Sequence, residues 1–395
     1  MQIKWNNHVV ILYGKDKDSQ VAQALKHHIE REFHPCDVVA IDNVAYTNAF
    51  EGFLSTMAYR FCAKHARWIL RVASEKRDKR NQQRIKEQSK TREVVSEKDK
   101  KKKSKILRVV NIIKRFDPIV VICTSPTALM LAIRARHELG RDLRIVGAVT
   151  DFALDPAFVQ WGADGYFVEN PEIKQKLVHL GIEAERISVI GMPSIRPSYE
   201  ARAERKRTVG ITNDLPVVVV DGGAYGTDTI KEDIVLLMRN KRDFNLVILG
   251  ANKKLRRYYM DLPEFSAGVI ILDKLDENVL DIADIFVTVP NSKSVFAAFM
   301  RGVSVVIAQS VTNQEHEIRR YLVKRALVIP SRTPMETLFA VDELLKDPER
   351  EMEFKQRGST YAAMSLKDIA NLTPRLTGRG EHLRLKHVDS DTDKK

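Results

Sequence analysis

Residues 216–228 read PVVVVDGGAYGTD. The four valines from Val217 to Val220 form a continuous apolar run, which is typical of a parallel strand covered on both faces. The run leads directly into a turn with three glycines, and a helix is expected to follow. Glycines at a strand-to-helix turn let backbone N–H groups approach a phosphate, and the helix N-terminus adds favourable partial charge. A plain tight turn explains the same glycines, so both interpretations stay open at this point.

Strands and helices alternate along both halves of the chain. Short apolar strands are expected at 8–13, 118–123, 143–149, 166–168, 187–190, 216–220, 244–249, 269–272, 285–289, 303–307 and 326–329. Ser125 and Asn170 each precede a proline, which predicts a helix N-cap followed by proline at the first helical position. Such alternation in both halves predicts two doubly wound α/β domains rather than one sheet.

The length of 395 residues also favours two domains. We place an N-terminal domain at 1–195, with a basic insertion at 75–105, and a C-terminal domain at 208–360. The polar stretch RPSYEARAERKRT at 196–208 is the expected junction. A helix and a disordered tail are expected at 361–395.

The net charge of +13 is concentrated in one segment, because residues 75–105 hold fourteen Lys/Arg and six Asp/Glu. This segment has no aromatic residue to stack on bases, so nucleic acid is not an expected partner. Residues 54–72 before it have the spacing of a basic amphipathic helix, which suits an anionic membrane surface. The residues expected to face the membrane are Arg60, Phe61, Lys64, Arg67, Trp68 and Arg71. A core-facing helix with solvated cations, followed by a solvated disordered insertion, is the alternative.

The three cysteines, Cys36, Cys62 and Cys123, are widely separated and form no C-x-x-C pair. Buried thiols in a reducing compartment are the simplest interpretation. The N-terminus lacks the apolar core of a signal peptide, and the longest apolar stretch is too short to span a bilayer. A cytoplasmic protein that is peripheral on the inner face of the cell membrane is therefore expected.

Several loops follow the expected strands in a recognisable order. The motifs are VTDF at 149–152, GMP at 191–193, GGAYG at 222–226, GANKKL at 250–255 and NQE at 313–315. With this order and spacing the chain resembles, from about His8 to Arg357, the monogalactosyldiacylglycerol synthase and processive diacylglycerol glucosyltransferase family. These enzymes are related to the murein UDP-GlcNAc transferase.

The resemblance implies a GT-B fold, with two Rossmann-like domains facing a cleft. It also implies inverting, metal-independent transfer of a hexosyl group from a UDP-sugar to a membrane lipid acceptor such as diacylglycerol, with no cofactor. The donor-side residues that it implies are Gly222, Gly223 and Gly226 at the diphosphate, Asn252 by the uracil, Ser292, and Gln314 and Glu315 at the sugar. On the acceptor side it implies Asp151 and Asp155, with Asp18 in the place of the catalytic base.

The chain departs from this family on its ligand-facing loops. Asp18 and Asp155 stand where the family carries histidine, and Asn313 stands where it carries glycine. The family's Thr-Lys-Pro-Gly-Gly is TVPNS at 288–292, and the residue that holds the ribose is Ala297. Losses confined to the site are typical of a degenerate enzyme or of altered donor preference. A catalytically impaired homologue that acts as a regulatory or scaffolding binding protein is therefore the alternative function.

Overall fold

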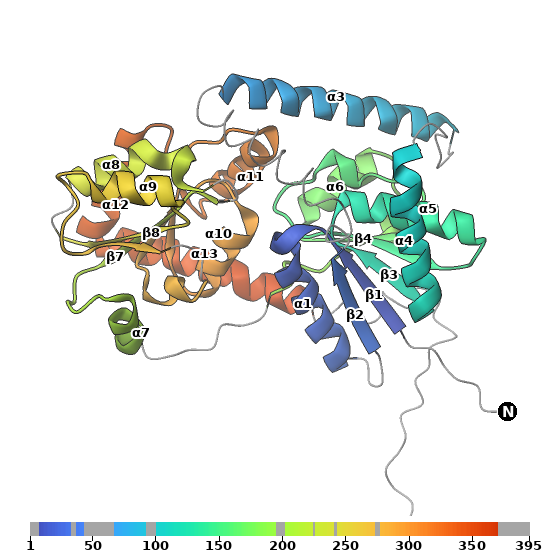
Figure 1. Cartoon of the computed structure of the whole chain (residues 1–395), viewed down its shortest axis with the longest axis horizontal. Helices are drawn as coiled ribbons and strands as arrows, with labels where there is room; N and C mark the ends of the chain where they lie inside the picture. The colour runs from blue at the N-terminus through green and yellow to red at the C-terminus, as the bar shows by residue number, and fades with distance from the viewer. Residues whose placement is uncertain are drawn as a thin grey trace, which may run out of the picture.

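The computed structural model describes residues 8–32, 37–42, 67–91, 100–194, 202–223, 226–240, 243–272 and 277–369. Within these residues it contains two six-stranded sheets, one in each half of the chain (Figure 1). The first sheet consists of β1 (His8–Tyr13), β2 (Asp37–Asp42), β3 (Val120–Cys123), β4 (Arg144–Val149), β5 (Gly165–Val168) and β6 (Ile187–Val189). The second consists of β7 (Val217–Asp221), β8 (Asn245–Leu249), β9 (Val269–Leu272), β10 (Ile285–Thr288), β11 (Ser304–Ile307) and β12 (Ile329–Pro330).

All neighbouring strands are parallel, in the orders β2-β1-β3-β4-β5-β6 and β12-β11-β10-β7-β8-β9. The second sheet therefore reverses its direction of growth between β7 and β10. The prediction of two doubly wound α/β domains is confirmed. In such sheets, ligands bind beyond the carboxyl ends of the strands at this point of reversal.

Helices cover both faces of each sheet. Those of the first half are α1 (Lys15–Glu32), α3 (Arg67–Thr91), α4 (Lys100–Phe116), α5 (Pro126–Leu139) and α6 (Pro171–His179), with the short 3-10 turns η1 (Pro156–Phe158) and η2 (Ala184–Arg186). Those of the second half are α7 (Arg202–Val209), η4 (Thr227–Ile230), α8 (Lys231–Arg239), α9 (Lys253–Met260), η5 (Glu277–Ile282), α10 (Ser292–Met300), α11 (Asn313–Lys324), α12 (Pro334–Lys346) and α13 (Pro348–Ile369).

The valine run of β7 shows why the second sheet forms. Val217 and Val219 pack in the core on one face, whereas Val218 and Val220 pack in the core on the other. All four side chains are completely buried. Because successive side chains of a strand point to opposite faces, only a strand covered by helices on both sides can bury such a run.

Two of the predicted helix starts are confirmed in detail. The Ser125 hydroxyl accepts a hydrogen bond from the Ala128 N–H at the start of α5, and the Asn170 side chain accepts one from the Ile173 N–H at the start of α6. Each cap satisfies an N–H group that has no partner within the helix. Helix α5 ends at Gly140, whose φ of 59° lies in the left-handed region that glycine adopts readily.

Other boundaries differ from those expected. Strand β2 had not been predicted, and the strand expected at 326–329 is only Ile329–Pro330. The polar junction contains α7, in which Arg202 pairs with Asp284 at 2.7 Å. Ion pairs with the second domain, rather than apolar burial, therefore hold this helix, and they left no apolar pattern to detect.

The basic insertion is partly helical, because α3 extends through residues 67–91. It lies across both domains at the top of Figure 1. Residues 54–66 of the amphipathic helix expected at 54–72, and residues 370–395 of the helix and tail expected at 361–395, lie outside the described residues. Among the helices that the structure describes, none combines the length and apolar character needed to cross a bilayer.

Candidate active site

The glycine turn after β7 lies at the point where the second sheet reverses. Gly223 and Gly226 have φ values of 67° and 77°, which other residues adopt only with strain. A Cβ on Gly222 would lie 2.0 Å from the Gly226 carbonyl oxygen, so the turn folds closely on itself. The Gly223 N–H donates to the buried Asp221 carboxylate at 2.9 Å. The three glycines predicted to face a diphosphate thus form a compact backbone turn.

The loop after β10 packs directly against this glycine turn. A Cβ on Gly223 would lie 2.6 Å from Cγ2 of Val289. Asn291 ends the loop as the N-cap of α10, and its side chain accepts hydrogen bonds from the Lys293 and Ser294 N–H groups at 3.1 and 3.2 Å. Strands β7 and β10 are neighbours in the sheet, so these two loops form one continuous edge.

Ser292, the first residue of α10, joins this edge to the N-terminal domain. Its hydroxyl donates to the Asp151 carboxylate, and its oxygen accepts a 3.0 Å hydrogen bond from the Phe152 N–H. Burial raises the pKa of Asp151 to about 6, although the Ser292 hydrogen bond and the charge of Lys293 oppose that rise. A predicted donor-side residue and a predicted acceptor-side residue are therefore in direct contact.

Gln314 and Glu315 lie in the first turn of α11 and have different partners. The Gln314 side chain donates to the Ala153 carbonyl of the N-terminal domain at 2.9 Å. The Glu315 carboxylate accepts from the Val311 and Thr312 N–H groups at 2.6 and 3.0 Å. Thr312 and Glu315 form a reciprocal capping box, a pattern visible in the sequence T-x-x-E that our sequence analysis missed.

Asn252 lies on the far side of the glycine turn, at the N-terminus of α9. Its side chain accepts a hydrogen bond from the Leu255 N–H at 3.0 Å and donates to Asp228 at 3.3 Å. Asp228 belongs to η4, which follows the glycine turn. Asn252 therefore connects the loops after β7 and β8, which are neighbouring strands.

The two aspartates at the family's histidine positions lie on separate elements. Asp155 caps η1 by accepting from the Ala157 N–H at 2.9 Å, and Arg77 of α3 lies 3.4 Å from its carboxylate. Asp18 lies near the start of α1, and its side chain is outside the described part of the chain.

The residues expected to face a membrane are only partly described. Arg60, Phe61 and Lys64 lie outside the described residues, and so do the side chains of Arg67 and Trp68, which begin α3. Arg71 is exposed and forms a 3.2 Å ion pair with Glu75. Exposure of Arg71 fits either a membrane-facing or a solvated helix, so the membrane orientation stays a prediction.

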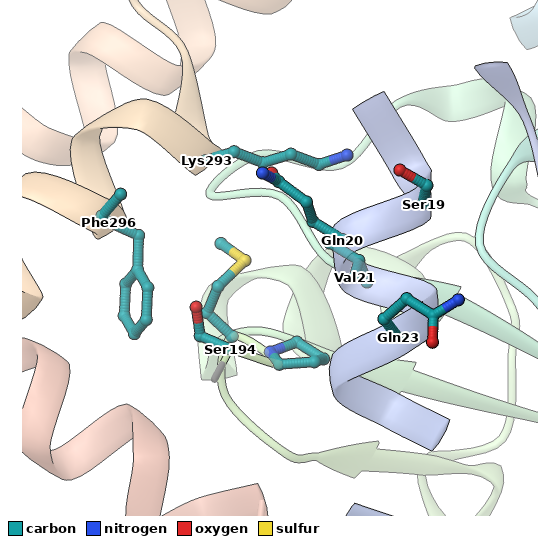
Figure 2. A pocket seen from close by; sticks show the side chains of 10 residues that line it. Ser19, Gln20, Val21, Gln23, Ser194, Lys293 and Phe296 are labelled. Carbon is teal, nitrogen blue, oxygen red and sulfur yellow. The ribbon is translucent and has the colours of Figure 1, made fainter. Parts of the chain in front are cut away.

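A cavity of about 270 Å³ lies between the domains. It is lined by Ser19, Gln20, Val21, Gln23, Met192, Pro193, Ser194, Lys293, Phe296 and Ala297. Figure 2 shows Lys293 extending from α10 towards Gln20 on α1, and Phe296 of the same helix α10 lying across the cavity from α1. Ala297, which the resemblance aligns with the family's ribose-holding residue, is part of this lining. The cavity is apolar at Met192 and Phe296 and polar around Lys293.

Lys293 is a site residue that the sequence analysis missed. The family's cation is lost at Val289, but Lys293 supplies another four residues later, in the first turn of α10. It lowers the pKa of Asp151 electrostatically, which places its charge near the contact between the domains. Its place in the first turn of α10, directly after the loop that follows β10, could have suggested that this lysine lies near a ligand at that edge.

A buried polar network lies behind this contact. The Tyr361 hydroxyl of α13 donates to Glu169 at 2.6 Å, and the Asn170 side chain donates to the same carboxylate at 2.6 Å. Burial raises the pKa of Glu169 to about 7. The ring of Phe152 stacks on Tyr321 of α11, with 5.6 Å between the ring centroids. The loop at 151–153 is thus embedded in the second domain.

The sequence comparisons agree with the resemblance. Residues 18–194 match the family model described as monogalactosyldiacylglycerol (MGDG) synthase. The processive diacylglycerol beta-glucosyltransferase of Bacillus pumilus is 26% identical over 257 residues, which are 63% of this chain and 66% of that protein. The Bacillus subtilis enzyme of the same name is 24% identical over 61% of this chain and 64% of its own length. The chain thus spans just under two thirds of the curated relatives that it matches, and the predicted resemblance is confirmed.

Solved structures share the architecture across nearly the whole chain. The UDP-GlcNAc 2-epimerase of Neisseria meningitidis, bound to UDP-GlcNAc, has a TM-score of 0.62 at 11% identity and covers 94% of this chain and 100% of its own. MurG of Acinetobacter baumannii has a TM-score of 0.57 at 12% identity, with 93% and 99% covered. These identities show the fold alone, and the predicted GT-B fold is confirmed.

Proposed function

We propose that this protein transfers a hexosyl group from a UDP-sugar to a membrane lipid acceptor such as diacylglycerol. The observation that carries the proposal is the glycine turn at 222–226, packed on the loop after β10 at the reversal point of the second sheet. Two further findings support it. The relatives are named diacylglycerol glucosyltransferases, and the Neisseria structure with this fold is bound to UDP-GlcNAc.

On the donor side, the turn would present backbone N–H groups to the diphosphate, and Lys293 supplies the positive charge. For this to occur, the Gly223 and Gly226 N–H groups must leave their present acceptors, the Asp221 carboxylate and the Gly223 carbonyl. A leaving UDP gains negative charge as the glycosidic bond breaks, and fixed donors stabilise that charge without reorganising. Asn252 would lie by the uracil, with Ser292, Gln314 and Glu315 around the sugar. For this to occur, Ser292 and Gln314 must exchange their present partners, Asp151 and the Ala153 carbonyl, for the donor.

On the acceptor side, a base must take the proton of the lipid hydroxyl as the sugar carbon is attacked. Asp18 holds the position of the family's catalytic histidine, next to Ser19 in the cavity lining. Asp151 is a second carboxylate at the domain contact, and its pKa of about 6 makes it a better proton acceptor at neutral pH than an exposed aspartate. Comparison of Asp18→Asn with Asp151→Asn in a turnover assay would identify the base.

We further propose that the enzyme is peripheral on the inner face of a membrane and contacts anionic lipids. The exposed side of α3 carries Lys76, Lys79 and Arg80, which lie in the basic segment singled out from the sequence. Each basic residue near an anionic surface contributes about 1 kcal/mol of attraction.

Titration with UDP and UDP-sugars, followed by turnover on diacylglycerol vesicles, tests the proposal. Binding together with glycolipid formation supports the transferase. Binding without turnover by any UDP-hexose would instead indicate the impaired homologue that acts as a binding protein.

A further inference from the structure

Helix α3 contacts both domains through one polar face. The partly buried residues Ser74, Asp78 and Asn81, and the buried Ile85, recur at steps of three or four and therefore share that face. Lys79 and Arg80 lie on the exposed side. Among the described side chains of α3, at residues 71–87, Ile85 is the single one in the buried core, so polar contacts account for most of its attachment.

Towards the C-terminal domain, α3 contacts the first residue of α11. The Asn313 side chain donates to the Asp78 carboxylate at 2.8 Å, and the Asn313 N–H donates to the Ser74 hydroxyl at 3.3 Å. Asn313 adjoins Gln314, whose side chain donates to the Ala153 carbonyl. The contact with α3 therefore acts on the turn of α11 that carries a donor-side residue.

Towards the N-terminal domain, α3 contacts the segment at 155–159. Arg77 lies 3.4 Å from the Asp155 carboxylate. Arg84 lies about two helical turns after Arg77. Its side chain donates to the Ala157 and Val159 carbonyls at 3.4 and 3.3 Å. This segment follows directly on the loop at 151–153 that enters the second domain.

The two contact points coincide with two departures from the family. The resemblance puts Asn313 where the family carries glycine, and a glycine could not donate a side-chain hydrogen bond to Asp78. It puts Asp155 where the family carries histidine, and here Asp155 pairs with Arg77. Two substitutions that look like losses from the site are thus the residues that receive α3, one on each domain.

We infer that α3 is an interdomain clasp and that Asp78 and Asn313 are positioning residues, which set the first turn of α11, and with it Gln314, against the acceptor-side loop. The inference rests on the proposed function for its consequence in donor binding. The clasp acts through Gln314 and the turn that carries it, and Asp78 itself touches no substrate.

The inference is tested by two variants, one that places a second carboxylate at the contact and one that swaps the aspartate and the asparagine between positions 78 and 313. Asn313→Asp places two carboxylates against each other, so it should open the clasp, while an aspartate in the first turn leaves α11 itself well capped. The double variant Asp78→Asn/Asn313→Asp restores a donor and an acceptor in reversed order. Gln83→Ala, on the exposed side of the same helix, is the matched control.

Hydrogen exchange of residues 71–91 and UDP affinity by calorimetry are the two measurements. Asn313→Asp should speed exchange in α3 and weaken UDP binding roughly fivefold to tenfold, in the range of coupling between contacting residues. The double variant should return both to within about twofold of the wild type, and Gln83→Ala should change neither.

If Asn313→Asp showed the same hydrogen exchange in α3 and the same UDP affinity as the wild type, the clasp would be overturned. A double variant as impaired as Asn313→Asp would overturn the pairing of Asp78 with Asn313. Absence of UDP binding by the wild type would contradict the proposed function and the positioning role. If hydrogen exchange in α3 still became faster in Asn313→Asp and returned to normal in the double variant, the clasp would nevertheless be supported as a contact between domains.

Discussion

The hydroxyl of Ser292, on the C-terminal domain, donates a hydrogen bond to the carboxylate of Asp151, on the N-terminal domain. The two residues are 141 positions apart in the chain. Ser292 stands at the end of the family's glycine-rich loop, and Asp151 belongs to the VTDF motif. The residues expected to face a ligand are thus joined across the domain boundary, and a donor must compete with this contact.

Ser292→Ala removes the hydroxyl donor from a buried carboxylate. We expect a loss of about 1–3 kcal/mol in the free energy of unfolding, because an unsatisfied buried group retains its desolvation cost. The pKa of Asp151 should rise further above about 6, since the hydroxyl bond now lowers it. Urea denaturation and NMR titration measure the two quantities. With Ser188→Ala as a control away from the boundary, unchanged stability and pKa would contradict the contact.

Glu169→Gln should flatten the pH dependence of stability. Burial raises the pKa of Glu169 from 4.5 to about 7, so the folded protein holds this proton more tightly than the unfolded chain. The resulting stability is fully present below about pH 4.5 and is lost as the pH rises through about 7.

The loss is on the order of 3–4 kcal/mol, because the pKa rises from 4.5 to about 7 and each pKa unit corresponds to about 1.4 kcal/mol. Glutamine stays neutral, accepts from Asn170 and donates to the Tyr361 hydroxyl. Denaturation between pH 5 and 7.5 checks this expectation, and Asp151 supplies a smaller slope common to both proteins. Equal slopes in the wild type and Glu169→Gln would refute the assignment.

Gly222→Ala tests the close packing of the glycine turn. The added methyl carbon would lie 2.0 Å from the Gly226 carbonyl oxygen, so the turn must shift and its N–H groups must move. We expect UDP binding to fall below detection in calorimetry while circular dichroism stays near that of the wild type. Gly140→Ala is the control, because Gly140 also has a positive φ but open space around it. It should cost about 1–2 kcal/mol in stability and leave UDP binding unchanged.

Neutralising the exposed cations of α3 tests the membrane proposal. The triple variant Lys76→Gln/Lys79→Gln/Arg80→Gln should lower the affinity for anionic vesicles on the order of 100-fold, because each charge contributes about 1 kcal/mol. Co-sedimentation with the vesicles measures this affinity. Lys253→Gln/Lys254→Gln/Arg257→Gln makes the same charge change on α9 and should have a much smaller effect. If both triple variants sediment alike, α3 has no special part in membrane binding.

The fold could be predicted because its signals are local. The valine run of β7, the caps Ser125 and Asn170, and the glycine turn each act within a few residues. Strand β2 was missed because its burial is partial outside Val38. The contacts that distinguish this site could not be predicted in the same way. Ser292 with Asp151, and Asp78 with Asn313, join residues more than a hundred positions apart, and no local pattern records such pairs.

The structural roles of Asn313 and Asp155 also could not be predicted from the sequence. Compared with the family motif, each is a lost functional residue. In the structure, each is a polar partner of α3, a helix whose docking face is not apolar and therefore leaves no hydrophobic periodicity. Lys293 was overlooked for a related reason, because the family's cation lies four positions earlier in the chain.

Calorimetric titration of the folded wild-type protein with UDP tests the central claim most directly. We predict saturable binding with a Kd between roughly 1 µM and 1 mM, the usual range for enzyme substrates. Lys293→Met should weaken it about tenfold to a hundredfold, since a charge-assisted contact with the diphosphate contributes roughly 1.5–3 kcal/mol. Absence of heat from the intact protein with UDP and with every common UDP-sugar would contradict a nucleotide-sugar site at the glycine turn.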